Sequence, residues 1–162
     1  MRRSTQHKVV SLATLTGLVR RAKRAGRRVV FTNGCFDLLH VGHVQLLERA
    51  KTLGELLVVA INSDRSVRAL KGPRRPVVTQ AARAQVLAAL AAVDYVTIFD
   101  QPTPQQLIER LRPDVLVKGA DWGASAIVGR EAMRRRGGRV VRIPLRRGCS
   151  TTRLIERIRA RS

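Results

Sequence analysis

The stretch that decides the fold reads VVFTNGCFDLLHVGH and occupies residues 29–43. Its apolar, partly β-branched start is typical of a buried strand, and a turn of small residues follows. Two histidines, His40 and His43, then stand in an H-x-G-H spacing where a helical pattern begins. Because a helix N-terminus presents free backbone amides and the positive end of its dipole, this arrangement predicts a phosphate-binding site.

The bulk composition is that of an ordinary globular domain. The chain has 162 residues, of which 44% are hydrophobic, and this suits one domain with a full core. We expect a single domain over residues 1–162, with a helical extension at 1–26 and a core at 27–160. No apolar run approaches the roughly 20 residues of a membrane span, and no long apolar segment follows the basic N-terminus. Cys35 and Cys149 are too few for a disulfide framework and lack metal-ligand spacing, so we expect a cytoplasmic protein.

The strongest compositional bias is positive charge, formally +21 at pH 7. Two interpretations are open: solvated surface arginine, or affinity for a polyanion such as nucleic acid. Only five of the 32 basic residues are lysines, and the arginines are spread along the whole chain. Aromatic residues make up 3% of the chain, so few rings are present on which bases could stack. We favour the solvated interpretation and expect no nucleic-acid or membrane partner.

Strand-like and helical segments alternate along the chain. Strands are predicted at residues 28–32, 56–61, 95–99, 115–117 and 139–143. Helices are predicted at 11–25, 42–53, 80–92, after Thr103, at 125–136, and after Ser150 or Thr151, the last with Leu154, Ile155 and Ile158 inward. This alternation predicts an α/β fold: a Rossmann-like three-layer α/β/α domain with a five-stranded parallel sheet. In such sheets ligands bind beyond the carboxyl ends of the strands, where strand order reverses.

The histidine pair is the leading catalytic candidate. Transfer of a nucleotidyl group needs hydrogen-bond donors around a phosphate that gains charge during an in-line displacement. Two imidazoles three residues apart can reach one phosphate at a helix start, and Gly42 lets the backbone approach without a Cβ. A zinc site would use the same side chains, but no third ligand follows at a suitable spacing.

The turn after the first predicted strand contains Asn33, Gly34, Cys35 and Phe36. Its small residues allow main-chain amides to face the phosphates of a nucleotide. Cys35 is interpreted as a small filler rather than a nucleophile, and Phe36 as a core residue. For Asp37 two roles are open, because its carboxylate could orient the loop or face the phosphate of an acceptor substrate.

Four further polar residues lie in the region from the end of the second predicted strand to the next long helix. Asn62 and Asp64 lie where a substrate or ribose contact is expected, although Asp64 could instead cap a short helix. The absence of G-x-G-x-x-G after the first strand argues against a dinucleotide. Lys71 stands in a loop rich in Pro and Gly that could close on the β- and γ-phosphates. Arg83, on the next helix, is a candidate for either a site or a structural role.

Two segments near the C-terminus complete the candidate site. Lys118, Asp121 and Trp122 leave the fourth predicted strand, and Trp122 could stack on a base, line the pocket or fill the core. Three residues with hydroxyl groups lie at the start of the final predicted helix, shortly after a glycine. Together with the free amides of the helix start, they could bind a second phosphate. These residues are Ser150, Thr151 and Thr152.

The combined motifs resemble those of one branch of the H-x-G-H nucleotidyltransferases, the D-glycero-β-D-manno-heptose 1-phosphate adenylyltransferases. The resemblance covers residues 8–160. It rests on Thr32-Asn33-Gly34-Cys35-Phe36-Asp37 before H-x-G-H and on four further segments. These are Asn62-Ser63-Asp64, Leu70-Lys71-Gly72 with Arg75-Pro76, Val117-Lys118-Gly119 with Asp121, and Gly148-Cys149-Ser150-Thr151-Thr152. It implies ATP and Mg²⁺, with ADP-heptose and pyrophosphate as products.

The resemblance also implies roles for the candidate residues. His40, His43 and Lys71 would be catalytic, and Asp37, Asn62, Asp64, Lys118 and Trp122 would bind the sugar substrate. The nucleotide would contact Asn33, Gly34, Cys35, Phe36, Gly42, Asp121, Ser150, Thr151 and Thr152. No protein ligand for the metal is assigned. The start of the chain resembles the stand-alone form, so we expect a separate heptose kinase, and the family suggests a homodimer.

A glycerol-3-phosphate cytidylyltransferase that uses CTP is the alternative within the same superfamily. That family has a similar segment before its final helix, preceded by an Arg-Thr-x pattern. Here Leu145-Arg146-Arg147 precedes Gly148, which argues against CTP. Ala120 stands where the heptose branch usually has glycine, so the exact sugar and its anomer stay open.

Overall fold

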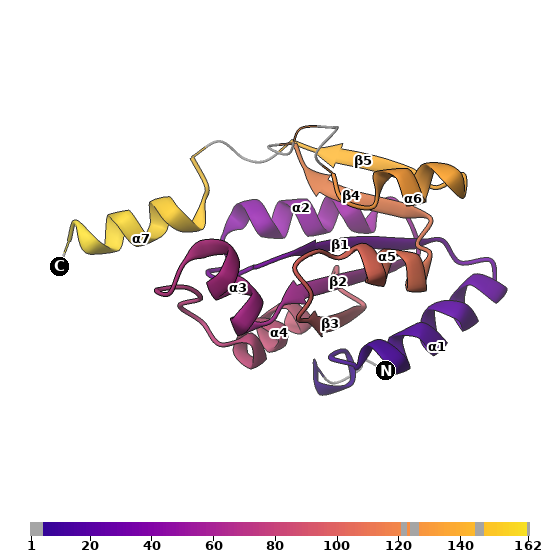
Figure 1. Ribbon diagram of the computed structural model, residues 1–162, viewed down its shortest axis with the longest axis horizontal. Helices are drawn as coiled ribbons and strands as arrows, with labels where there is room; N and C mark the ends of the chain where they lie inside the picture. Colours follow the sequence, from indigo (N-terminus) through magenta and orange to yellow (C-terminus); the bar gives the residue numbers. More distant parts are fainter. Residues whose placement is uncertain (1–4, 121–122, 124–126, 145–147, 162) are drawn as a thin grey trace.

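A parallel sheet forms the centre of the domain in the computed structural model, which describes residues 5–120, 123, 127–144 and 148–161. Among the described residues the sheet has five strands in the order β3-β2-β1-β4-β5 (Figure 1). The strands are β1 (Val29–Gly34), β2 (Leu56–Asn62), β3 (Tyr95–Phe99), β4 (Val115–Gly119) and β5 (Arg139–Ile143). All four pairings are parallel, which confirms the predicted sheet.

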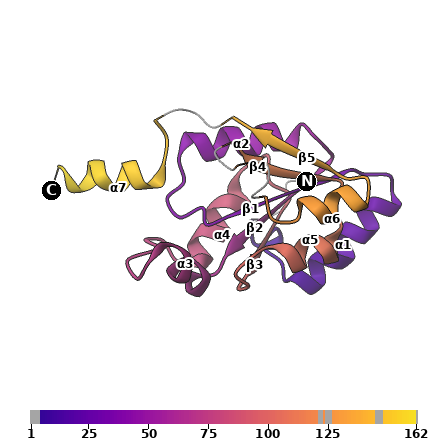
Figure 2. The same ribbon diagram turned by 45° about the horizontal axis from the view of Figure 1, so that its top comes forward.

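Helices cover both faces of the sheet and give it two separate cores. They are η1 (Thr5–His7), α1 (Leu12–Arg24), α2 (Val41–Lys51), α3 (Asp64–Lys71), α4 (Gln80–Ala89), α5 (Gln105–Leu111), α6 (Arg130–Arg135) and α7 (Thr151–Arg159). Apolar residues of α1, α5 and α6 pack in one cluster, and those of α2 and α4 pack in the other. Successive residues of β1 alternate between them, with Phe31 in the first cluster and Val30 in the second. Figure 2 shows the same three layers from a second direction.

Serine or threonine hydroxyls cap α1, α3, α4 and α7. Thr79 caps α4. Of the two residues proposed to cap α7, Ser150 does so, and its hydroxyl accepts from the Arg153 amide. The cap of α3 is Ser63, so Asp64 is the first residue of that helix and not its cap. Similarly, α5 begins one residue later than expected, because Pro104 occupies the N-cap position.

The last helix differs from its prediction. Its apolar stripe of Leu154, Ile155 and Ile158 was expected to face inward, but α7 contains no buried residue and Ile158 is 60% exposed. Figures 1 and 2 both show α7 extending away from the sheet. The prediction was wrong because periodicity reveals an apolar face but does not show which surface, if any, packs against it.

The helix before β5 is predicted over 125–136, and in the part of this range that the structure describes it covers only Arg130–Arg135. It begins at Arg130, because Gly129 precedes it with φ +89° in the left-handed region that glycine favours.

Within the described part of the chain, no helix has the length and apolar character that crossing a bilayer requires.

Candidate active site

A cavity of about 600 Å³ opens at the carboxyl ends of β1, β2 and β4. The strand order reverses beside β1, between β2 and β4, so the cavity lies where doubly wound sheets bind ligands. The start of α2, the end of α3 and the start of α7 complete its walls. The chain therefore brings segments that are more than 100 residues apart into one hollow.

Most of the predicted site residues line this cavity. They are Asn33, Gly34, Cys35, Phe36, Asp37, His40, Gly42, His43, Asn62, Lys71, Lys118, Ser150, Thr151 and Thr152. Asp64 is not among the residues that line it, and the predicted contacts of Asp121 and Trp122 lie outside the described residues. Several other residues line the cavity to which the sequence assigned no site role. Leu70, Arg75 and Cys149 belong to quoted motifs, and the others are Pro102, Thr103, Pro104 and Val128.

The two histidines form a stacked pair at the start of α2. His40 occupies the N-cap position without a side-chain cap bond, and its ring lies 3.8 Å from the ring of His43, centroid to centroid, at an interplanar angle of 21°. Both Nδ1 atoms are buried, and neither has a hydrogen-bond partner among the described residues. Packing thus holds the pair in place, and the two Nδ1 atoms remain without hydrogen bonds to the described residues.

Burial keeps this pair uncharged at neutral pH. Desolvation, and to a smaller extent the neighbouring His40, lower the pKa of His43 from 6.5 to about 4. Desolvation also lowers the pKa of His40. Neutral rings can still donate hydrogen bonds to phosphate, and an anion beside them would favour their protonated forms.

This pKa shift predicts that the fold loses stability in acid. The unfolded chain binds a proton at His43 below about pH 6.5, whereas the folded chain does so only near pH 4. Between these two pH values protonation therefore favours the unfolded chain, and stability that is present above pH 6.5 is lost as the pH falls toward 4. The free energy of unfolding should drop by up to roughly 3 kcal/mol. Urea unfolding at pH 7.5 and 4.5 measures it. H43Q should reduce the loss of stability between the two pH values, whereas H7Q, at an exposed histidine, should not. An equal loss in the wild type and both variants would refute the lowered pKa of His43 as the cause.

Gly42 is required by the histidine pair itself. A Cβ at this position would lie 3.0 Å from both Cε1 and Nδ1 of His40 and 3.3 Å from the Cβ of Cys149. A side chain here would therefore push the His40 ring from its place over His43. The residue preserves the geometry of the pair in addition to leaving the backbone open.

The turn after β1 packs beneath the histidines. Phe36 is 5% exposed and adopts a left-handed φ of +46°, with its ring centroid 5.1 Å from that of His43. A Cβ on Gly34 would lie 3.1 Å from the Phe36 ring, which explains the small residue there. Phe36 is thus a core residue, as predicted, that also borders the cavity.

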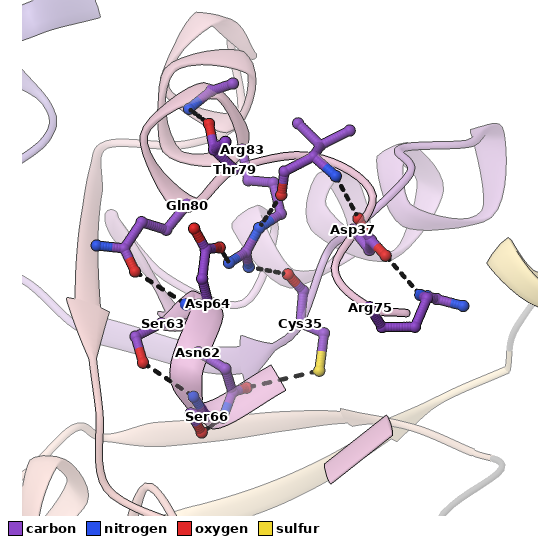
Figure 3. Close-up of polar contacts among 12 residues, drawn as sticks. Cys35, Asp37, Asn62, Ser63, Asp64, Ser66, Arg75, Thr79, Gln80 and Arg83 are labelled. Carbon is purple, nitrogen blue, oxygen red and sulfur yellow. Dashed lines mark hydrogen bonds and ion pairs between the residues drawn. The ribbon is translucent and has the colours of Figure 1, made fainter. Parts of the chain in front are cut away.

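Asp37 anchors the loop between α3 and α4. Its buried carboxylate accepts hydrogen bonds from the amides of Val77, at 2.8 Å, and Val78, at 2.9 Å. Arg75 Nε donates a third bond of 2.6 Å (Figure 3). Burial alone would raise the pKa of Asp37, but these hydrogen bonds outweigh burial and lower it. Of the two roles left open by the sequence, the contacts favour orientation of the loop.

Arg83 ties three segments together beneath the cavity. The residue is 1% exposed, and its guanidinium donates to the carbonyl oxygens of Cys35 and Val78 and to Asp64 Oδ1, the last at 2.7 Å. Figure 3 shows these bonds converging on one side chain. Asp64 is therefore the ion-pair partner of Arg83, and its contacts favour a structural role over the expected substrate contact. The sequence left the role of Arg83 open, and its contacts make it a positioning residue.

The Cys35 thiol has no sign of activation. Burial raises its pKa, although the positive charges of Lys71, Arg83 and Arg75 counteract this effect. Its Sγ lies 3.9 Å from Asn62 Oδ1. A protonated, partly buried thiol is a poor nucleophile, so the environment agrees with its interpretation as a small filler.

The remaining predicted residues approach the cavity from β4 and α7. Lys118 is 7% exposed and its ammonium donates to Asn33 Oδ1. The Ser150 hydroxyl accepts from the Arg153 amide at 3.2 Å, and the Thr151 hydroxyl donates to the Leu38 carbonyl at 3.2 Å. One hydroxyl thus serves as a cap and the next ties α7 to the turn before α2. Thr152 is exposed and lines the cavity.

The described residues do not fit a resident metal ion. They contain no group of three His, Cys, Asp or Glu side chains placed to hold one. The carboxylate of Asp37 borders the cavity, but three donors from the neighbouring loop already occupy it. Mg²⁺ commonly enters phosphate-transfer sites on the substrate phosphates with few protein ligands, and we assign no step to it here.

Comparisons with known proteins agree with this architecture. The sequence profile of the family described as cytidylyltransferase-like matches residues 31–157. The bifunctional protein HldE of Koribacter versatilis (strain Ellin345) is 59% identical over 152 residues, which are 94% of this chain and 31% of that protein. The bifunctional protein HldE of Geotalea uraniireducens (strain Rf4) is 54% identical over 155 residues, 96% of this chain and 32% of that protein. The chain spans about a third of the length of these relatives.

Solved structures show the same fold. The lipopolysaccharide core biosynthesis protein from Thermoplasma volcanium GSS1 superposes with a TM-score of 0.65 and 26% identity, over 75% of this chain and 99% of that one. Pantothenate synthetase from Thermus thermophilus shares the fold alone, with a TM-score of 0.59 and 18% identity over 85% of this chain and 61% of that one. The profile match, the identity to HldE and the histidine pair in the cavity agree with one another. The chain belongs to the cytidylyltransferase-like family of nucleotidyltransferases.

Proposed function

We propose that the chain transfers AMP from ATP to D-glycero-β-D-manno-heptose 1-phosphate, giving ADP-heptose and pyrophosphate. The observation that carries the proposal is the stacked pair of His40 and His43 at the start of α2. The pair borders a cavity at the carboxyl ends of β1, β2 and β4, and cationic Lys71 and Lys118 border it too. Such a site suits a reaction between two phosphorylated substrates.

In the proposed reaction, a phosphate oxygen of the sugar 1-phosphate attacks the α-phosphorus of ATP. A new P–O bond forms as the bond to the β-phosphate bridging oxygen breaks, and pyrophosphate leaves in line with the attack. His40 and His43 would donate hydrogen bonds to the oxygens that gain charge. Lys71 and the free amides at the start of α7 would hold the departing phosphates.

The other cavity residues would orient the two substrates. We propose that the turn from Asn33 to Phe36 and the hydroxyls of α7 contact the nucleotide, together with Asp121. Asn62, Lys118 and Trp122 would contact the sugar phosphate. The two groups adjoin each other, because Lys118 donates to Asn33 Oδ1 and Cys35 Sγ lies 3.9 Å from Asn62 Oδ1, so both ligands would share one cavity with the histidine pair.

The choice of ATP and a heptose rests on the motifs that resemble the heptose branch and on the identity to HldE. Those relatives are named bifunctional, and we propose that their second activity is the preceding kinase step, supplied to this chain by a heptose kinase. The name of the Thermoplasma protein, lipopolysaccharide core biosynthesis protein, agrees with a product that serves glycan assembly. A homodimer in the cytoplasm completes the proposal.

Pyrophosphate release tests the proposed reaction directly. Each of the four NTPs is paired with heptose 1-phosphate and with glycerol 3-phosphate, in the wild type and in H43A. Turnover with ATP and the heptose that is lost in H43A supports the proposal. Turnover only with CTP and glycerol 3-phosphate would instead support the glycerol-3-phosphate cytidylyltransferase alternative. Absence of pyrophosphate release with every pair of substrates would reject both reactions.

Substitution of Gly42 tests the link between backbone and histidine geometry. G42A places a Cβ 3.0 Å from the His40 ring, so we expect kcat to fall roughly tenfold to a hundredfold because a reacting group is displaced. The Tm should change little, because alanine favours the helix by about 1 kcal/mol, which offsets the crowding. G17A is the control, since a Cβ there meets nothing within 4 Å. Full activity in G42A would show that the His40 position does not matter.

A further inference from the structure

Arg75 reaches the cavity with part of its guanidinium unused. Its Nε donates to Asp37 Oδ2 at 2.6 Å, and the side chain is 19% exposed and borders the cavity. Neither terminal nitrogen has a hydrogen-bond partner among the described residues. Figure 3 shows the Arg75 side chain attached to Asp37 through one nitrogen, with its end directed away from that carboxylate.

The bond to Asp37 orients the side chain rather than holding the loop. Asp37 also accepts from the amides of Val77 and Val78, and Arg83 Nε donates to the Val78 carbonyl at 2.9 Å. The loop therefore keeps three anchors without Arg75. Fixing Nε fixes the plane of the whole guanidinium, because the group is rigid and planar. The terminal nitrogens are thereby preorganised as a two-pronged donor.

The local charge favours an anion at those nitrogens. Among the described residues, Asp37 is the only acidic residue that lines the cavity. Its side chain is fully buried, and its carboxylate already accepts hydrogen bonds from Arg75, Val77 and Val78. Lys71 also lines the cavity and adds a second positive charge. The charges of Lys71 and Arg75 both act on the thiol of Cys35, which also lines the cavity, and oppose the effect of burial on its pKa.

We propose that Arg75 binds a substrate phosphate through its two terminal nitrogens and that Asp37 is the positioning residue that aims them. Planar bidentate contact with phosphate is the interaction for which arginine is suited and lysine is not. The inference deepens the proposed function and rests on it for the identity of the phosphate, which belongs either to the nucleotide or to the acceptor.

Calorimetric titration with ATP, inorganic pyrophosphate and heptose 1-phosphate provides a readout that does not need turnover. R75Q should weaken binding of the ligand that Arg75 contacts by roughly tenfold to a hundredfold. Weaker ATP and pyrophosphate binding identifies the nucleotide phosphates, and weaker heptose 1-phosphate binding alone identifies the acceptor. R74Q removes the same charge from an exposed neighbour in the same loop and should bind all three ligands like the wild type.

Two further variants separate binding from folding and test the role of Asp37. R75K keeps the charge and should still lose most of the affinity, because an ammonium cannot form the planar contact. D37N should weaken the same ligand, and D37N/R75Q should be no weaker than R75Q alone, because the two residues act as one unit.

Unchanged binding in both R75Q and R75K, or an equal loss in R74Q, would overturn the inference. So would a wild-type protein that binds none of the three ligands. If the wild type binds ATP and depends on Arg75 but releases no pyrophosphate with any acceptor, the proposed reaction fails while the assignment of Arg75 stands.

Discussion

Replacing His43 by asparagine should lower kcat for nucleotidyl transfer by about 10²- to 10³-fold, the usual effect of removing one preorganised donor from a developing charge. The reason lies in the geometry of the pair: the His43 ring is partly buried, stacks on His40 and borders the cavity. Its Nδ1 is buried without a partner among the described residues, so the fold does not use it. Steady-state kinetics at saturating substrate measure the change.

The same substitution should not reduce stability at neutral pH. The Nδ1 atom of His43 forms no hydrogen bond with the described residues, so the substitution breaks none there, and active-site groups are commonly kept at a cost to the fold. We therefore expect H43N to have a Tm equal to or above that of the wild type while its kcat falls. H7N, at the exposed histidine, is the matched control for both readouts. Loss of activity that tracks loss of folded protein would contradict a catalytic role.

Replacing Arg83 by methionine should destabilise the fold by about 3–5 kcal/mol, the usual cost of breaking a buried ion pair by removing one member. The change leaves the Asp64 carboxylate without its partner, and it leaves the Cys35 and Val78 carbonyls without the guanidinium donors. Urea unfolding of R83M measures the loss. The kcat should fall as well, because the bonds position the turn after β1 and the loop before α4.

An exposed ion pair provides the control for R83M. Arg65 pairs with Asp100, and its side chain is 80% exposed, so R65M should cost less than about 1 kcal/mol. R83K should lie between the two, because lysine keeps the charge but cannot supply three directed donors. A loss below about 1 kcal/mol in R83M, the range of an exposed pair, would show that the three segments are held together without Arg83.

The strands were the most accurately predicted elements. The bounds of β3 and β5 agree with the prediction, and β2 is one residue longer. These strands are short apolar runs between clear turn signals, and each is a local property of the sequence. The helix ends were less accurate, because capping depends on the backbone conformation around Ser63, Pro104 and Gly129.

The candidate site divides in the same way. His40, Gly42 and His43 could be recognised because one short segment contains them, and the strand before the helix already predicted their place. Arg83 was a candidate and Arg75 was part of a quoted motif, but neither could be given a role, because their roles depend on residues up to 48 positions away. A single arginine in an arginine-rich chain carries no local signal that separates a buried positioning residue from a solvated one.

By itself the sequence determined the α/β class, the five parallel strands and the position of the histidine pair, because periodicity and turn chemistry act over a few neighbouring residues. Tertiary structure alone decided that Asp64 pairs with Arg83, that Asp37 holds Arg75, and that α7 extends from the domain. Ion pairs, the pKa of a buried ring and the packing of an amphipathic face depend on what surrounds each group in space, and chain folding sets those surroundings.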